Sequence, residues 1–93
     1  MKTQTLRLTV SGQVQGVGYR AWATRIATEF GLRGWVRNRV DGSVEMLISG
    51  RDQDVAAMIV AARKGPRAAR VSEVQITEAE DDGSIGFVMR PTA

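Results

Sequence analysis

The sequence predicts an α+β fold in which two helices cover one face of an antiparallel sheet of four strands, with a short extra strand at the C-terminal end. Three observations support this prediction. Apolar and polar residues alternate in five stretches, apolar residues recur every three to four positions in two others, and the turn dipeptide Asp41-Gly42 separates the two middle strands. The resulting βαββαβ order is the ferredoxin-like plan of two βαβ units sharing one sheet.

The predicted strands follow from a period of two residues. In the first strand, Leu6, Leu8 and Val10 fall on one face of an extended chain, which is the pattern of a half-buried strand. The two middle strands form a hairpin, because an Asp-Gly pair tolerates the positive φ angles of a tight turn. The predicted strands are residues 5–11, 35–40, 43–49, 71–78 and the short 85–89, in which Ile85, Phe87 and Met89 alternate.

The predicted helices follow from apolar residues that are spaced by three and four. Residues 19–30 carry Trp22, Ile26 and Phe30 on one face, with Ala23 and Ala27 beside them. Residues 52–64 carry a second apolar stripe, and the Gly-Pro pair after them is typical of a helix end. Because each helix has a single apolar stripe, we expect both to cover the same face of the sheet.

Length and composition suggest an ordinary globular protein. The 93 residues allow one domain, expected over residues 1–93, and the hydrophobic and charged fractions of 43% and 25% are close to the globular average. No apolar run approaches the roughly 20 residues that cross a bilayer. We therefore expect a cytoplasmic protein that acts as a monomer and binds no membrane.

The residue types that are missing limit the chemistry. The sequence has no histidine and no cysteine, so it offers no imidazole base, no thiol nucleophile and none of the usual ligands of zinc or copper. We therefore expect no metal and no other cofactor. All but Lys2 and Lys64 of the 13 basic residues are arginines, whose planar fork suits phosphate. An anionic partner fits this composition, although a solvated surface explains most single arginines as well.

A glycine-rich segment connects the first strand to the first helix. Its glycines let the backbone curl so that successive N–H groups point into one concavity, where the helix dipole also attracts an anion. Arg20, in the first helical turn, adds a charged fork. The alternative is that the glycines only permit a tight turn and that Arg20 is solvated. The candidate phosphate-binding residues are Gln15, Gly16, Val17, Gly18, Tyr19 and Arg20.

Asn38 is the only asparagine, and it falls on the same strand face as Val36 and Val40, which we expect to be buried. The first two strands of a ferredoxin-like sheet run parallel, so Asn38 should lie at the same sheet edge as the glycine-rich loop. A side-chain amide can orient a water molecule through its donor and its acceptor. The alternative is an amide that pins a loop or a backbone group near the hairpin. Because an amide is no general base, a reaction here needs a substrate that is already activated.

The segments GQVQGVGYR and GWVRN closely resemble the acylphosphatase family, and the similarity extends over nearly the whole chain. The resemblance implies metal-independent hydrolysis of acyl phosphates to a carboxylate and inorganic phosphate. It also implies that residues 15–20 with Arg20 bind the phosphate and that Asn38 orients the attacking water. Two departures are small: Gln13 stands where the family is often basic, and Gly18 stands where some members have an aromatic residue.

Other functions are possible on this fold. A non-catalytic role would resemble the acylphosphatase-like domains fused to carbamoyl-transfer proteins of hydrogenase maturation, but a 93-residue chain that begins at Met1 favours a free-standing enzyme. A nucleic-acid module would need aromatic residues on its third strand, SVEMLIS, which has none, so we expect no nucleic-acid partner. The arginine cluster Arg33, Arg37 and Arg39 either steers anions toward the loop or forms a solvated face. Met89 is expected to be packing filler.

Overall fold

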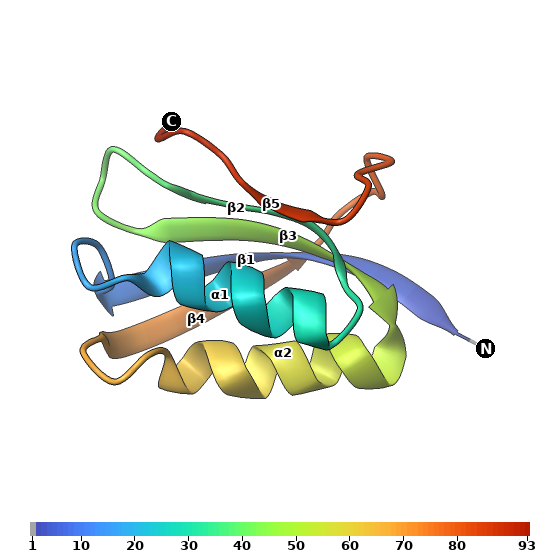
Figure 1. Cartoon of the computed structure of the whole chain (residues 1–93), viewed down its shortest axis with the longest axis horizontal. Helices are drawn as coiled ribbons and strands as arrows, with labels where there is room; N and C mark the ends of the chain where they lie inside the picture. Colours follow the sequence, from blue (N-terminus) through green and yellow to red (C-terminus); the bar gives the residue numbers. More distant parts are fainter. Residues whose placement is uncertain (1) are drawn as a thin grey trace.

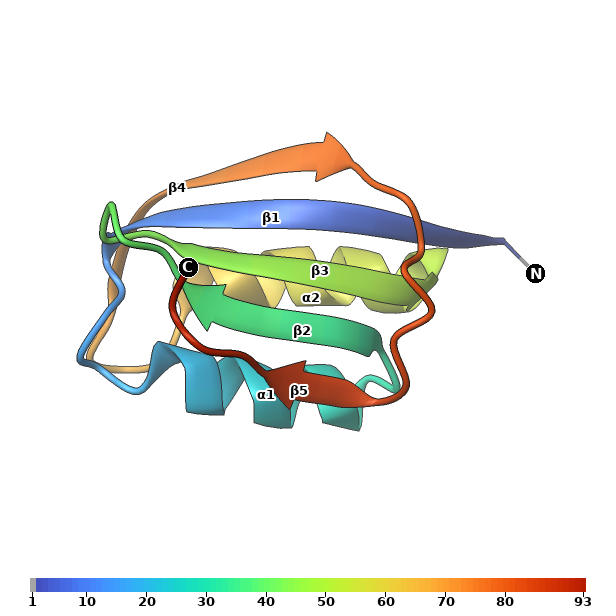
Figure 2. The same ribbon diagram turned by 90° about the horizontal axis from the view of Figure 1, so that it is seen from above.

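The computed structural model describes residues 2–93, and its strands and helices follow the predicted order. The strands form one five-stranded sheet in the order β4-β1-β3-β2-β5. Both helices cover the same face of this sheet, and its other face carries no helix (Figures 1 and 2). The elements are β1 (Thr3–Gln13), α1 (Tyr19–Glu29), β2 (Arg33–Asn38), β3 (Val44–Arg51), α2 (Asp52–Lys64), β4 (Arg70–Glu78) and β5 (Phe87–Met89).

The strand directions confirm the prediction for four strands and correct it at the fifth. β3 pairs antiparallel with both β1 and β2, and β4 pairs antiparallel with β1. β5 runs parallel to β2, with Trp35 opposite Val88, so the expected antiparallel sheet is in fact mixed. The chain after β4 crosses the end of the sheet to the opposite edge, where it enters beside the start of β2 (Figure 2). Arg33 fixes this crossing by donating hydrogen bonds to Asp81 and to the carbonyl oxygen of Ser84.

Helix α1 faces the sheet through smaller side chains than we predicted. Ala23 and Ala27 are fully buried, whereas Trp22, Ile26 and Phe30 are partly buried and pack at the border of the core. Alanines at the contact let a helix approach a sheet closely, and the larger side chains then fill the flanks. The predicted apolar face therefore has the expected members, but the two alanines and not the larger side chains lie at its centre.

Two predicted strands were extended too far. Val40 is 86% exposed because β2 ends at Asn38 and the hairpin loop follows. Ile85 is 92% exposed because β5 begins only at Phe87, which is the buried residue of the three predicted to alternate. The Asp-Gly hairpin itself is confirmed, since Asp41 accepts a hydrogen bond from the Ser43 backbone at 2.9 Å. Periodicity identified these strands, but it did not locate the residues at which pairing stops.

Gly34 occupies a position in β2 where no side chain fits. Its φ angle is +143°, and a Cβ atom placed there would collide with the carbonyl oxygen of Leu47 on β3. The same Cβ would lie 3.4 Å from the ring of Phe87 on the other neighbouring strand, which is close to an ordinary contact distance. The glycine that opens the GWVRN segment is therefore needed for the close approach of β3 to β2.

We predict that Gly34→Ala lowers the free energy of unfolding by more than about 2 kcal/mol, because it combines an unfavourable φ with a backbone collision. Gly83→Ala is the matched control: its φ is +78°, but a Cβ there meets nothing within 4 Å. That control should cost about 1 kcal/mol, the strain alone. Urea unfolding of both variants measures the difference, and equal losses would contradict the steric explanation.

Candidate active site

The segments expected to form the site do lie at one edge of the sheet. β1 and β2 are parallel to each other because both pair antiparallel with β3, so their C-terminal ends meet at the left of Figure 2. A cleft of about 180 Å³ opens there between the β1–α1 loop and the end of β2. It is lined by Val14, Gly16, Gly18, Tyr19, Arg20, Ala21, Asn38 and Met89. Four of the six predicted loop residues and Asn38 thus share one cleft, and Gln15 and Val17 do not line it.

The loop leaves the start of α1 open toward the cleft. Gly16 and Gly18 have φ angles of +74° and +79°, a left-handed conformation that turns the chain sharply into the helix. Gly18 is the N-cap and has no side chain to bind the first-turn N–H groups, and the first turn contains no acidic residue. These N–H groups, with the positive end of the helix dipole, are suited to bind an anion.

Arg20 is the cation of the cleft. No carboxylate of residues 2–93 forms an ion pair with it, whereas Arg33, Arg37 and Arg39 are all paired. Its own backbone carbonyl accepts a hydrogen bond from the hydroxyl of Thr24, which is local to the helix. The guanidinium is therefore available to an anionic ligand.

Asn38 lines the cleft from the last residue of β2. Its backbone is held by pairing with Val44 and by a hydrogen bond from the Ala93 N–H to its carbonyl oxygen at 3.0 Å. Within the described part of the chain its side chain makes no hydrogen bond that would pin a loop or a strand. The amide is thus free to bind water or substrate in the cleft.

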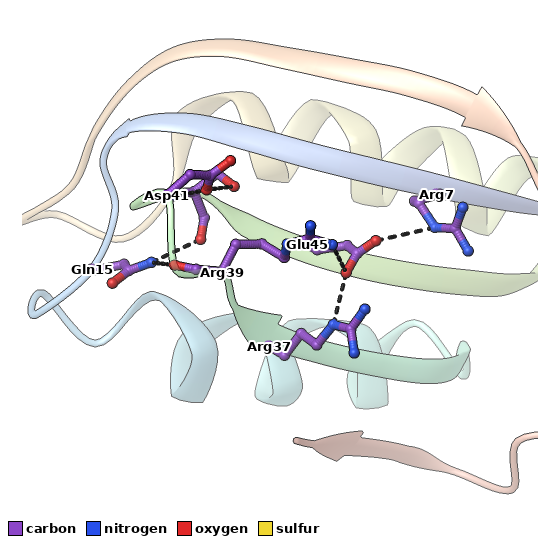
Figure 3. A network of polar contacts seen from close by, with 7 residues as sticks. Arg7, Gln15, Arg37, Arg39, Asp41 and Glu45 are labelled. Carbon is purple, nitrogen blue, oxygen red and sulfur yellow. Dashed lines mark hydrogen bonds and ion pairs between the residues drawn. The ribbon is translucent and has the colours of Figure 1, made fainter. Parts of the chain in front are cut away.

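Gln15 makes the pinning contact that we considered for Asn38. Its side-chain nitrogen donates hydrogen bonds to the carbonyl oxygens of Arg39 and Ser43, each at 2.8 Å (Figure 3). From the sequence we expected this residue to act only through its position in the phosphate-binding loop. A side-chain bond to residues 24 and 28 positions away has no local sequence signal.

The side chain of Tyr19, one of the candidate phosphate-binding residues, belongs to the core. It is 1% exposed, and its hydroxyl donates a hydrogen bond to the Ala62 carbonyl oxygen near the end of α2 at 2.9 Å. Burial raises the pKa of this phenol well above its usual value. Only the backbone of Tyr19 is therefore placed to bind a ligand, and its ring ties α1 to α2.

The family follows from comparison with known proteins. The model of the family described as Acylphosphatase matches residues 6–89. The acylphosphatase of Rhodopseudomonas palustris (strain BisB5) is 55% identical over 82 residues, which cover 88% of this chain and 83% of that protein. The chain belongs to the acylphosphatase family. The resemblance noted in the sequence is thereby confirmed.

Two solved structures, one of a small protein and one of a much larger protein, have a fold similar to that of this chain. The crystal structure of acylphosphatase from Bacillus subtilis matches with a TM-score of 0.90 and 32% identity, over 96% of this chain and 99% of that one. Full-length HypF, in a phosphate- and nucleotide-bound form, matches with a TM-score of 0.89 and 27% identity. That match covers 98% of this chain but 12% of HypF. The α+β fold with two helices on one sheet is therefore shared by both.

Residues 2–93 lack two other kinds of functional feature. No cluster of three or more histidine, cysteine, aspartate or glutamate side chains is arranged to hold a metal ion. No helix in the same range has the length and apolar character needed to span a membrane.

The predicted arginine cluster is held in ion pairs, with Arg37 and Arg39 bound on the sheet face that carries no helix. Glu45, 6% exposed, accepts hydrogen bonds from Arg37 at 2.7 Å and Arg39 at 3.1 Å and pairs with Arg7 at 3.2 Å (Figure 3). Burial alone would raise the pKa of Glu45, but the hydrogen bonds from the two arginines outweigh it and leave the pKa below its usual value. Arg33 binds Asp81, so each arginine of the cluster has a carboxylate partner, an arrangement that favours a structural role over anion steering.

We predict that Glu45→Gln lowers the free energy of unfolding at pH 7 by about 2 kcal/mol, because it leaves three arginines without their carboxylate. The folded-state pKa of Glu45 is lowered, so its stabilisation is present above the unfolded-state pKa and is lost as pH falls through the folded-state pKa. The difference from wild type should therefore be constant near neutral pH and shrink as pH falls below the unfolded-state carboxyl pKa of about 4.3.

Urea unfolding at several pH values measures this difference. The matched control is Glu29→Gln, which removes an exposed pair with Arg25 at 3.8 Å and should change stability by less than about 0.5 kcal/mol. A penalty for Glu45→Gln that stays constant down to pH 3 would contradict the proposed ion-pair origin.

Proposed function

We propose that this chain is a working acylphosphatase, which hydrolyses acyl phosphates to a carboxylate and inorganic phosphate without a metal ion. One observation carries the proposal: Arg20 without a carboxylate partner, an uncapped helix start and the free amide of Asn38 line one cleft in a member of this family. We also propose that the protein acts as a monomer and that it is cytoplasmic. The cytoplasmic proposal fits a sequence that contains no cysteine.

Residues 15–20, which we call the cradle, would bind the phosphate of the substrate. Backbone N–H groups of residues 15–20 would donate hydrogen bonds to the phosphate oxygens, and the guanidinium of Arg20 would neutralise their charge. The two ends of the loop are anchored before substrate binds, because Val14 and Tyr19 are each 1% exposed, and this anchoring would preorganise the donors between them. Preorganised donors stabilise charge that develops during the reaction without a cost of reorganisation.

Asn38 would orient the attacking water. A bond forms from the water oxygen to phosphorus, the bond from phosphorus to the acyl oxygen breaks, and the carboxylate leaves with the electron pair. Carboxylates are stable anions at neutral pH, so the leaving group needs no general acid. The water proton passes to a phosphate oxygen, so no side chain has to act as a base. Positioning and charge stabilisation would then supply the rate enhancement.

We predict that the purified chain hydrolyses an aryl acyl phosphate in the presence of a chelator. Arg20→Ala and Asn38→Ala should each lower kcat/KM by about 100-fold or more, the usual effect of removing one group that stabilises the transition state. Arg20→Ala should also weaken inhibition by inorganic phosphate. Asn38→Ala should leave this inhibition within about threefold, because its amide acts on water and not on the cradle.

The controls use similar side chains outside the cleft. Arg25→Ala removes an exposed arginine of α1, and Gln53→Ala removes an exposed amide of α2. Both variants should keep wild-type rates. Turnover that stops on addition of a chelator would exclude the metal-independent mechanism. A wild-type chain without turnover would favour the alternative, a role inside a larger protein such as HypF.

A further inference from the structure

The side chain of Gln15 connects the loop of the cleft to the β2–β3 hairpin. Its amide nitrogen carries two hydrogens, and both are used: one hydrogen bond ends on the Arg39 carbonyl and the other on the Ser43 carbonyl, each at 2.8 Å. The N–H of Arg39 also donates to the Ser43 carbonyl at 2.8 Å, so these two residues close the base of the hairpin. Gln15 is therefore attached to the base of that hairpin (Figure 3).

This connection is short on both sides. Gln15 directly precedes Gly16, which lines the cleft, and Arg39 directly follows Asn38. Within residues 2–93, no other hydrogen bond joins loop residues 14–18 to hairpin residues 39–43. The polar contacts that fix the loop relative to Asn38 thus reduce to the two bonds of one side chain.

We propose that Gln15 is a positioning residue, whose amide sets the distance between the phosphate cradle and Asn38. The inference rests on the proposed function, in which water held by Asn38 attacks phosphorus held by the cradle. In-line attack requires the reacting atoms to be aligned, and a displacement of about 1 Å can cost on the order of 100-fold in rate. Gln15 does not line the cleft, so it acts through the two groups that it connects.

A near-isosteric apolar residue isolates this role. Gln15→Met keeps the length of the side chain and adds no charge, but it removes both hydrogen bonds. We expect kcat to fall by about 10- to 100-fold, while inhibition by inorganic phosphate stays within about threefold because the cradle amides and Arg20 are unchanged. The matched control is Gln13→Met, an exposed amide two positions earlier, which should match wild type in both measurements.

A second variant tests the hydrogen bonds themselves. Gln15→Glu places a carboxylate against two carbonyl oxygens, whereas its protonated form can again donate one hydrogen bond. The ratio of its kcat to that of wild type should therefore rise as pH falls through the carboxyl pKa. The corresponding ratio for Gln15→Met should not change with pH. A flat ratio for both variants would overturn the proposal.

A double-mutant cycle decides whether Gln15 acts through Asn38. In the Asn38→Ala background, Gln15→Met should lower kcat by less than about twofold, because the oriented water is already lost. Independent, multiplying effects would overturn the proposal, as would a Gln15→Met variant with unchanged kcat or with phosphate inhibition weakened in step with kcat. Failure of the proposed function is seen separately, in wild-type and Asn38→Ala rates.

Discussion

The pairing of β3 with two strands at once is the constraint on which the cleft depends. Val44, fully buried at the start of β3, lies opposite Val10 of β1 and opposite Asn38 of β2. Neighbouring strands are about 4.8 Å apart, so Asn38 and Val10 are separated by about two such spacings. Because β1 continues only to Gln13, the loop that follows must begin beside the end of β2. A shift of this register would separate the two halves of the cleft.

The end of β2 is fixed from both faces of the sheet. Asn38 lies on the helix side and faces the cleft, while its neighbours Arg37 and Arg39 bind Glu45 on the opposite face. The backbone is held by Gln15 as well, and by Ala93, whose N–H and carbonyl both bond to the strand end. A site without a titratable base gains little from pKa tuning, so accurate placement of neutral groups is the property these contacts supply.

Periodicity and topology made much of this structure predictable. The hairpin turn, the two helices and the meeting of Asn38 with the loop depend on local patterns and on the rule that β3 lies between β1 and β2. The exposure of Val40 and Ile85 was not predictable, because alternation continues past the residue at which pairing ends. Met89 was expected to be packing filler, yet it lines the cleft. Its position depends on the parallel pairing of β5 with β2, a long-range contact that leaves no local pattern in the sequence. The hydrogen bonds of Gln15 depend on the same long-range geometry.

The distribution of arginines sets the cleft apart from the rest of a modestly basic surface. The net charge is +3, but six arginines are bound by carboxylates of the described residues, among them all three of the predicted cluster. Exposed charges are screened beyond about 10 Å in ordinary salt, so these pairs contribute little attraction at the cleft. Arg20 is the one arginine that lines it, next to the N–H groups that start α1. In the proposed function, affinity for phosphate would therefore depend on this guanidinium and the helix start, while Arg7, Arg37 and Arg39 join three strand segments through Glu45.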